Sequence, residues 1–226
     1  MTLDGDCAIW LYGSHARGDA DSLSDVDVLV VSNRDMDPEA LPSVVASPSR
    51  LSITRYAWRE IEGMAEYGSL FLRHIQLEGC ALREGTAVRG RMVNLLSTLP
   101  RYSLAGRDLK GFQTVLADVR ASLDSEVHLT FELATLATLF RHACILGCAV
   151  CGSPCFSRFG PIAQLVRQWG LSSTWSDEFP ALYAYRLYAS GRSQRPGKPS
   201  REMARLWCDR AAILLAELEV RVHDWS

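Results

Sequence analysis

Short apolar runs and one alternating segment characterise the amino-terminal part of the chain. Residues 7–12 and 26–31 have the length and composition of buried strands, and residues 50–56 alternate polar and apolar side chains as a half-buried strand does. We expect helices over residues 38–46, 58–67 and 70–77, and a short last strand over residues 81–83. This pattern predicts a small mixed sheet backed by helices.

The strand signals end near Thr86, and apolar residues then recur at three- and four-residue spacing, as in amphipathic helices. The expected helices span residues 88–99, 109–123, 127–150, 161–169, 179–189 and 202–222. Pro100 marks the change of character, which places the boundary between residues 85 and 100. We therefore expect an α+β domain over residues 1–90 and an all-α helical bundle over residues 91–226.

Composition and charge are those of an ordinary globular protein, with 48% hydrophobic and 22% charged residues. The net charge of −2 argues against a generally basic nucleic-acid binder. Seven scattered cysteines fit reduced thiols in a cytoplasm. We expect no signal peptide, because Asp4 and Asp6 occupy positions where a leader needs basic residues. Arg141 and His142 interrupt the most apolar stretch, which favours a buried helix over a membrane span.

One stretch between the first two predicted strands carries the chemistry. Gly13 and Ser14 follow the first apolar run, and Asp25 and Asp27 stand at the start of the second. Residues i and i+2 of a strand point to the same face, so both carboxylates should be presented together. Two anionic oxygen ligands suit Mg²⁺, and a Gly-Ser turn lets backbone N–H groups approach phosphate oxygens. The pattern predicts a magnesium site beside a bound polyphosphate.

At these residues the sequence resembles the DNA-polymerase-β-like nucleotidyltransferase superfamily. In particular, it resembles minimal nucleotidyltransferases and the amino-terminal domains of antibiotic nucleotidyltransferases. Their Gly-Ser, spacer and Asp-x-Asp pattern is matched by Gly13, Ser14, Asp25 and Asp27, and the resemblance covers about the first 85 residues. It implies a polymerase-β-like fold and transfer of a nucleoside monophosphate from an NTP or dNTP, with ATP as the expected donor, to an acceptor hydroxyl.

The resemblance also assigns roles to individual side chains. Asp25 and Asp27 would be the catalytic residues and the ligands of Mg²⁺ or Mn²⁺, in a two-metal in-line displacement. Ser14 and the backbone around Gly13 would hold the β- and γ-phosphates, and Arg17 would add a charge-assisted contact to the triphosphate. The alternative is an acidic hairpin turn that solvates its own carboxylates.

The sequence departs from the family pattern at a third carboxylate, which related enzymes carry on the next strand of the sheet. Residues 50–56 contain no acid, and Ser52 and Thr54 occupy the expected face. Three explanations stay open: another acid folds into the site, the metal or a partner protein activates the acceptor, or the chain is a catalytically weak or inactive nucleotide-binding, antitoxin-like module. The candidate replacement acids are Glu60, Glu62 and Asp6.

The expected partners follow from this class. The acceptor would be a protein, a tRNA or an oligonucleotide, in a toxin–antitoxin or anti-phage setting, and no membrane is involved. The helical part would shape the acceptor site or mediate contact with a second copy or a partner protein. It resembles the HEPN group loosely, without that group's spacing of Arg and His.

Three further clusters have both a functional and a structural interpretation. Cys144, Cys148, Cys151 and Cys155 could bind a metal, but small core residues at helical spacing are favoured. His74 and Glu78 lie four apart on a predicted helix, and a structural role before a Gly79 helix cap is preferred to a metal site. The basic, Pro- and Gly-rich segment 190–200 is either a phosphate- or nucleic-acid-binding loop or a solvated one.

Overall fold

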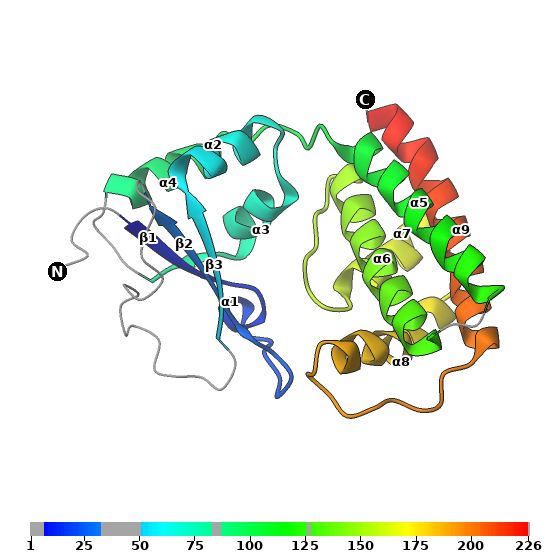
Figure 1. Ribbon diagram of the computed structural model, residues 1–226. Coiled ribbons are helices and arrows are strands. Elements are labelled where there is room, and N and C mark those ends of the chain that lie inside the picture. The colour runs from blue at the N-terminus through cyan, green and yellow to red at the C-terminus, as the bar shows by residue number, and fades with distance from the viewer. Residues whose placement is uncertain (1–6, 33–50, 83–86, 126–127, 226) are drawn as a thin grey trace. The chain divides into compact units, whose positions relative to one another are not determined.

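The computed structural model describes residues 7–32, 51–82, 87–125 and 128–225 (Figure 1). Internal contacts divide the chain into two compact units, Met1–Tyr102 and Ser103–Ser226. The helix expected over residues 38–46 lies outside the described residues. Within them, the first unit is a sheet with helices and the second consists of helices, as the pattern predicted.

The first unit contains a mixed four-stranded sheet in the order β3-β2-β1-β4. Its strands are β1 (Cys7–Tyr12), β2 (Val26–Ser32), β3 (Leu51–Ala57) and β4 (Cys80–Ala81). β1 is antiparallel to both β2 and β4, whereas β2 and β3 are parallel. The α+β prediction is confirmed, and the first three strands agree with it to within one residue.

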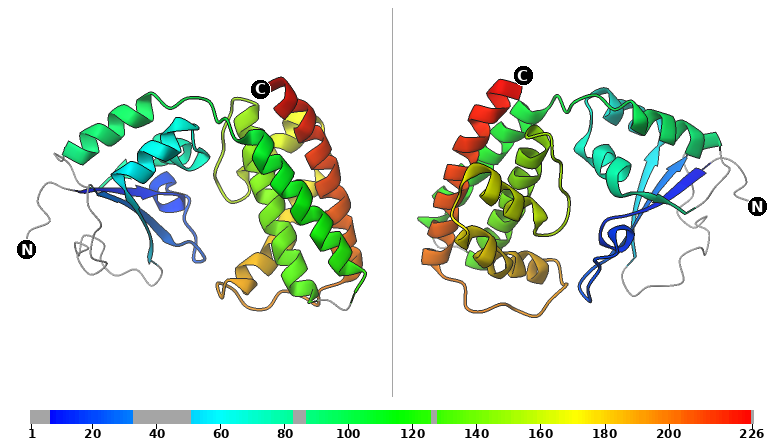
Figure 2. Two further views of the ribbon diagram at one scale, coloured as in Figure 1. Left: turned by 45° about the horizontal axis from the view of Figure 1, so that its top comes forward. Right: turned by 180° about the vertical axis from the view of Figure 1, so that it is seen from behind.

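Helices cover one face of this sheet, as Figures 1 and 2 show. They are α2 (Trp58–Glu66), α3 (Leu70–Glu78) and α4 (Ala87–Ser97). Strand residues alternate between the faces, so every second side chain of β1 and β2 enters the core under these helices. That core consists of Ala8, Trp10, Tyr12, Leu29, Val31, Trp58, Ile61, Leu72, Ile75, Val88, Met92 and Leu96. Cys7, Ile9, Val28 and Val30 form a smaller cluster on the other face.

The helix α4 packs with the sheet, although its sequence suggested the first helix of the bundle. Its buried side chains belong to the core under α2 and α3, and the segment after it is held there as well. Arg73 donates from Nη2 to the carbonyl oxygens of Leu99 (3.2 Å) and Pro100 (2.9 Å). Gln76 donates to the carbonyl oxygen of Leu96 (2.6 Å). The units therefore separate after Tyr102, later than the predicted residue 90.

The second unit is built around one central helix. Its elements are α5 (Ala105–Leu123), α6 (Leu129–Val150), α7 (Gly160–Trp169), α8 (Thr174–Ala189) and α9 (Arg201–Trp225). All four other helices pack against α6. Among the described residues α6 alone is long and apolar enough to cross a membrane, and 78% of its most apolar window is buried inside the unit. It is the core helix that the sequence predicted.

Helix α8 begins five residues before its expected start at residue 179 because tertiary packing extends it. Pro180 lies inside the helix, where the missing N–H is unfavourable. Trp175 and Phe179 nevertheless pack against Phe140 of α6, with ring centroids 5.9 and 5.7 Å apart. Both side chains are at least nine-tenths buried, and this burial outweighs the local cost.

Candidate active site

The chain turns sharply where β1 ends. Gly13 has φ +73° and ψ −150°, a backbone conformation that is essentially restricted to glycine. It leads into α1 (Ser14–Arg17), a single turn in which the N–H of Arg17 bonds to the carbonyl oxygen of Gly13 (3.0 Å). Gly18, at φ +79°, ends this turn in the left-handed conformation. The Gly-Ser segment is therefore a tight bend between two backbone positions with positive φ.

Asp27 lies directly against this bend. Tyr12 and Asp27 are paired across β1 and β2, so Gly13, the residue that follows β1, lies next to the Asp27 carboxylate. A Cβ atom on Gly13 would stand 2.9 Å from Oδ2 of Asp27, closer than side chains tolerate. The structure thus brings the predicted Gly-Ser turn and the second predicted aspartate together, and it explains why residue 13 has no side chain.

Asp25 and Asp27 flank the first residue of β2, Val26. Both are partly buried, and Asp25 immediately precedes the strand. Asp27 alternates with Val26 and Val28, which belong to the uncovered-face cluster, so it stands on the helix-covered face with Leu29. Strand alternation predicts the same side for Asp25, although its side-chain direction remains an expectation.

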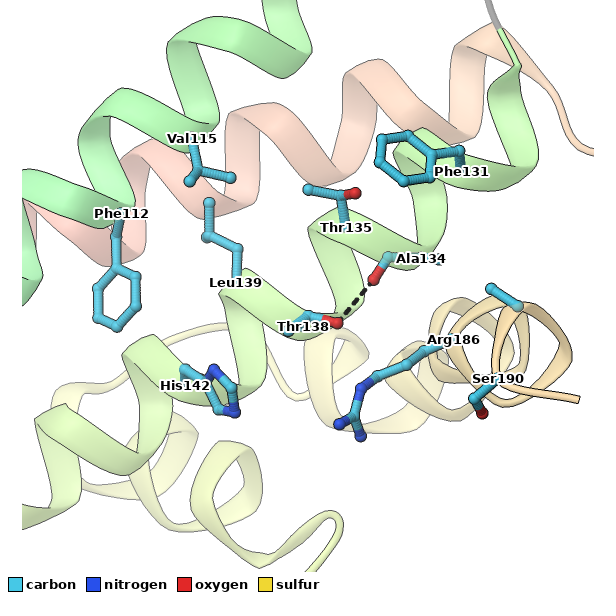
Figure 3. Close-up of a pocket in the computed structure, with 11 residues that line it drawn as sticks. Phe112, Val115, Phe131, Ala134, Thr135, Thr138, Leu139, His142, Arg186 and Ser190 are labelled. Atoms are coloured by element: carbon cyan, nitrogen blue, oxygen red, sulfur yellow. Dashed lines mark hydrogen bonds between the residues drawn. The ribbon is translucent and has the colours of Figure 1, made fainter. Parts of the chain in front are cut away.

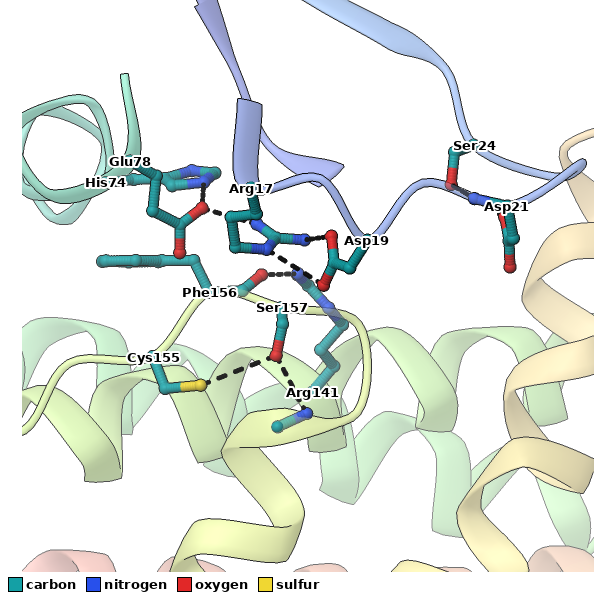
Figure 4. Close-up of polar contacts among 11 residues, drawn as sticks. Arg17, Asp19, Asp21, Ser24, His74, Glu78, Arg141, Cys155, Phe156 and Ser157 are labelled. Atoms are coloured by element: carbon teal, nitrogen blue, oxygen red, sulfur yellow. Dashed lines mark hydrogen bonds and ion pairs between the residues drawn. The ribbon is translucent and has the colours of Figure 1, made fainter. Parts of the chain in front are cut away.

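The spacer before Asp25 has its own local structure. Asp21 accepts from the N–H of Leu23 (3.0 Å) and from Oγ of Ser24 (2.7 Å), as Figure 4 shows for Ser24. This is an Asx-type turn in which a carboxylate satisfies nearby donors. The alternative of an acidic turn that solvates its own carboxylates therefore applies to Asp21, which lies in the spacer.

The parallel pairing of β2 and β3 places Ser52 beside Asp27. This is the position at which a third carboxylate would meet the pair, and a neutral hydroxyl stands there. Thr54 follows on the same face and is paired with Leu29 in register. Within the described part of the chain, no three His, Cys, Asp or Glu side chains gather into a metal-binding group.

Glu60 and Glu62 do not supply the missing acid, which corrects that explanation. Since β3 runs parallel to β2, α2 starts at the opposite end of the strand, six residues or about 20 Å beyond Ser52. There, Glu60 accepts from the backbone N–H of Ala57 (2.7 Å) and caps α2. Glu62 is paired with Arg91 at 3.5 Å. The third candidate, Asp6, lies outside the described residues.

Arg17 is held by two carboxylates (Figure 4). Its Nη1 lies 2.5 Å from Oε2 of Glu78, and its Nε and Nη2 contact the two oxygens of Asp19 at 3.2 and 3.1 Å. Nε2 of His74 lies 2.8 Å from the same Glu78 oxygen. Burial raises the pKa of Glu78, but the hydrogen bond from His74 and the ion pair with Arg17 outweigh it and hold the pKa below its ordinary value. His74 and Glu78 thus belong to an ion-pair network that includes Arg17.

Tyr12 connects this network to the aspartates. Its hydroxyl lies 3.2 Å from Oγ1 of Thr54, and its ring contacts the ring of His74 edge-on with centroids 5.5 Å apart. Burial raises the pKa of Tyr12, and the negative charge of Asp27 raises it further. Sequence reasoning missed Tyr12 and the Arg17–Glu78 pair. Only the position of Tyr12, immediately before Gly13, was a local signal.

The four cysteines of the second unit have separate surroundings. Cys148 contacts the carbonyl oxygen of Pro161 (3.5 Å), and Cys151 accepts from Nε1 of Trp169 (3.3 Å). Cys155 lies 3.6 Å from Oγ of Ser157, and Cys144 is buried in α6. These contacts favour the packing interpretation.

Cations next to the basic segment 190–200 bind protein groups. Nη2 of Arg201 donates to the carbonyl oxygen of Ser125 (2.8 Å), and Nη1 of Arg210 lies 2.7 Å from Oε2 of Glu178. These two side chains therefore join elements of the second unit. They do not support the interpretation of segment 190–200 as a phosphate-binding loop.

A mixed sheet, a Gly-Ser bend after its first strand and an Asp-x-Asp sequence at the start of the next strand therefore lie together in the first unit. Residues 2–64 match the family model described as nucleotidyltransferase domain. No curated protein matches this chain. The amino-terminal part of the protein therefore carries a nucleotidyltransferase domain, which supports nucleotidyl transfer as its general function and a nucleoside triphosphate as its substrate.

Proposed function

We propose that the protein is a metal-dependent nucleotidyltransferase that moves a nucleoside monophosphate from a triphosphate, with ATP as the donor, to an acceptor hydroxyl. The observation that carries this proposal is the placement of Asp27 against the Gly13 bend. A phosphate chain held at the bend would lie beside the carboxylate that would bind the charge-neutralising metal ion.

The donor set fits a hard divalent cation. Asp25 and Asp27 offer anionic oxygens at the start of β2, a central strand of the sheet. Mg²⁺ usually takes one or two protein carboxylates together with substrate phosphates. When bound, Mg²⁺ or Mn²⁺ would neutralise charge on the triphosphate and lower the pKa of the acceptor hydroxyl. The two aspartates would hold the metal and orient it toward the triphosphate, and the surrounding sheet fixes the spacing of the two aspartates.

The phosphate contacts come from the bend. With no side chain at Gly13, phosphate oxygens can approach the backbone, and the hydroxyl of Ser14 adds a donor. Arg17 contributes through an exchange of partners. Its contact with Asp19 is a surface ion pair of low strength, since the Asp19 side chain is 53% exposed, so a phosphate can replace that carboxylate. Glu78 keeps the guanidinium in place meanwhile.

The neutral Ser52 affects how the acceptor hydroxyl can be activated. A hydroxyl binds Mg²⁺ more weakly than a carboxylate and is a poor general base, so activation of the acceptor falls to the metal, to a partner or to an acid outside the described residues, such as Asp6. We therefore propose a specialised cytoplasmic enzyme that modifies a protein, tRNA or oligonucleotide acceptor in a toxin–antitoxin or anti-phage setting.

A direct test is incubation of the full chain with each labelled NTP and dNTP, with Mg²⁺ or Mn²⁺, followed by mass analysis of all products. Asp25→Asn and Asp27→Asn should each lower transfer by about a hundredfold or more, because each removes charge from the site. Asp118→Asn, on the exposed side of α5, is the control and should keep full activity. Equal transfer by Asp27→Asn and the wild type would refute the assignment.

A second function, nucleotide binding without turnover, is favoured by one observation: the absence of a carboxylate beside Asp27 on the described residues of β3. Such a module would bind the triphosphate and release no pyrophosphate. Equilibrium binding of the triphosphate, measured beside pyrophosphate release on the same sample, separates the two functions.

A further inference from the structure

The second unit contains a pocket of about 480 Å³ between α5, α6 and the end of α8 (Figure 3). This volume lies within the range of small-molecule sites. All of its lining residues belong to the helical unit, so the pocket is a property of that unit alone. An inference about it does not rest on the proposed transferase function.

The walls of the pocket are mainly apolar. Phe112 and Val115 come from α5, and Phe131 and Leu139 come from α6. Phe131 is 65% exposed at the rim. An apolar body inside the pocket would remove this aromatic surface from water.

Three hydroxyl groups line the pocket, those of Thr135, Thr138 and Ser190, and two of them have protein partners. Thr138 donates to the carbonyl oxygen of Ala134 (2.9 Å), and Ser190 donates to that of Leu187 (3.0 Å). Hydroxyls that are satisfied in this way offer little to a polar ligand. Recognition of an ionic head group in the pocket therefore depends on the two nitrogen-bearing side chains, His142 and Arg186.

Arg186 supplies the positive charge. Its Nη1 donates to the hydroxyl of Tyr183, and no carboxylate of the described residues pairs with it or lines the pocket. Figure 3 shows its guanidinium group turned toward the side of the pocket where the imidazole of His142 lies. Desolvation of the ring by neighbouring groups lowers the pKa of His142 to about 4, and Arg141 and Arg186 contribute to that shift, while part of the side chain stays exposed at the pocket mouth. At neutral pH the ring is therefore uncharged, and Arg186 is the cation that faces the pocket.

We propose that this pocket binds a small amphipathic anion, with its apolar body against Phe112, Leu139 and Phe131 and its carboxylate or other anionic head on Arg186. The planar guanidinium fork is suited to carboxylates and phosphates, and its charge is more strongly felt beside apolar walls than in open water. An uncharged His142 can donate one further hydrogen bond to the head group.

The test compares three compounds with the same apolar body and different heads: decanoate, decanol and decyltrimethylammonium. Calorimetric titration of the full chain should show one decanoate per chain, bound at least about tenfold more tightly than decanol, and no binding of the cation. Similar affinities for all three compounds, or binding of none, would refute the proposal.

Variants locate the site. Arg186→Gln should weaken decanoate binding by about tenfold or more and leave decanol binding unchanged. Arg205→Gln, which removes an exposed arginine of α9 outside the pocket, is the matched control and should bind as the wild type does. Thr135→Trp keeps Arg186 but fills the pocket, and it should abolish binding of both compounds. Unchanged decanoate affinity in Arg186→Gln or Thr135→Trp would place the ligand elsewhere and overturn the inference.

Discussion

Arg17 and Glu78 are 61 residues apart in the sequence, and their side chains form an ion pair of 2.5 Å. Arg17 ends the short helix after the Gly-Ser bend, and Glu78 ends α3 just before the last strand of the sheet. The pair therefore joins the short helix after β1 to the end of α3, beside the candidate site. His74 supports it by contacting the same carboxylate oxygen.

Glu78→Gln should lower the free energy of unfolding by about 1–3 kcal/mol at neutral pH, because it removes the more buried of the two carboxylates that pair with Arg17. The folded-state pKa of Glu78 lies below its ordinary value of 4.5. The carboxylate therefore stabilises the fold above pH 4.5, and that contribution is lost as the pH falls through the folded-state pKa. Urea unfolding of variant and wild type across this range should show the difference shrinking. Glu66→Gln, at an exposed position, is the control, and a pH-independent difference for Glu78→Gln would contradict the prediction.

Gly13→Ala should destabilise the protein by about 1–3 kcal/mol, since alanine is strained at this backbone conformation and its Cβ would press on Asp27. Triphosphate affinity should fall together with stability. Gly63→Ala is the matched control in α2, because a Cβ there meets no atom within 4 Å, and it should stabilise by about 0.5–1 kcal/mol. Thermal unfolding and nucleotide titration measure both effects. The steric account is wrong if the two alanine variants are equally stable.

Ser52→Asp would place a third carboxylate beside Asp27 in the parallel register. We expect Mn²⁺ to bind about tenfold more tightly, because affinity of oxygen sites for hard cations rises with the number of charged ligands. Ser52→Asn has nearly the same size without the charge and should bind Mn²⁺ as the wild type does. Titration followed by electron paramagnetic resonance compares them, and equal affinity in both variants would mean that metal does not reach this position.

His142 should make stability fall with acidity. An unfolded chain protonates this histidine near pH 6.5, whereas the folded chain does so only near pH 4. The unfolded state thus binds more protons between these values, and the free energy of unfolding decreases as the pH falls through this window. His142→Gln should lack this part of the slope, while His128→Gln, which replaces a histidine outside the pocket, should keep it. Denaturant midpoints at closely spaced pH values provide the measurement, and parallel curves for wild type and His142→Gln would disprove it.

Local pattern was sufficient for the strands and most helices, because buried strands and amphipathic helices are visible within short windows. The Gly-Ser and Asp-x-Asp elements were also local, and the antiparallel pairing of Tyr12 with Asp27 follows once two consecutive strands form a hairpin. The assignment of Asp25, Asp27, Ser14 and Arg17 to ligand binding stays a prediction.

Relationships between distant segments were not predictable from pattern. Nothing near Arg17 in the sequence indicates Glu78, and nothing in α4 distinguishes a helix that packs on a sheet from one that joins a bundle. The direction of β3 was equally hidden, although it decides that Glu60 lies at the wrong end of the strand. Each of these depends on which surfaces meet after the chain has collapsed.

The position of α4 has a practical consequence for the choice of a truncation boundary. The family match ends at residue 64, yet Val88, Met92 and Leu96 seal the hydrophobic interior that contains Trp10 and Leu29. A polypeptide truncated at residue 64 would leave those apolar surfaces bare and prone to aggregation. An isolated amino-terminal fragment should therefore extend through Tyr102 to remain soluble.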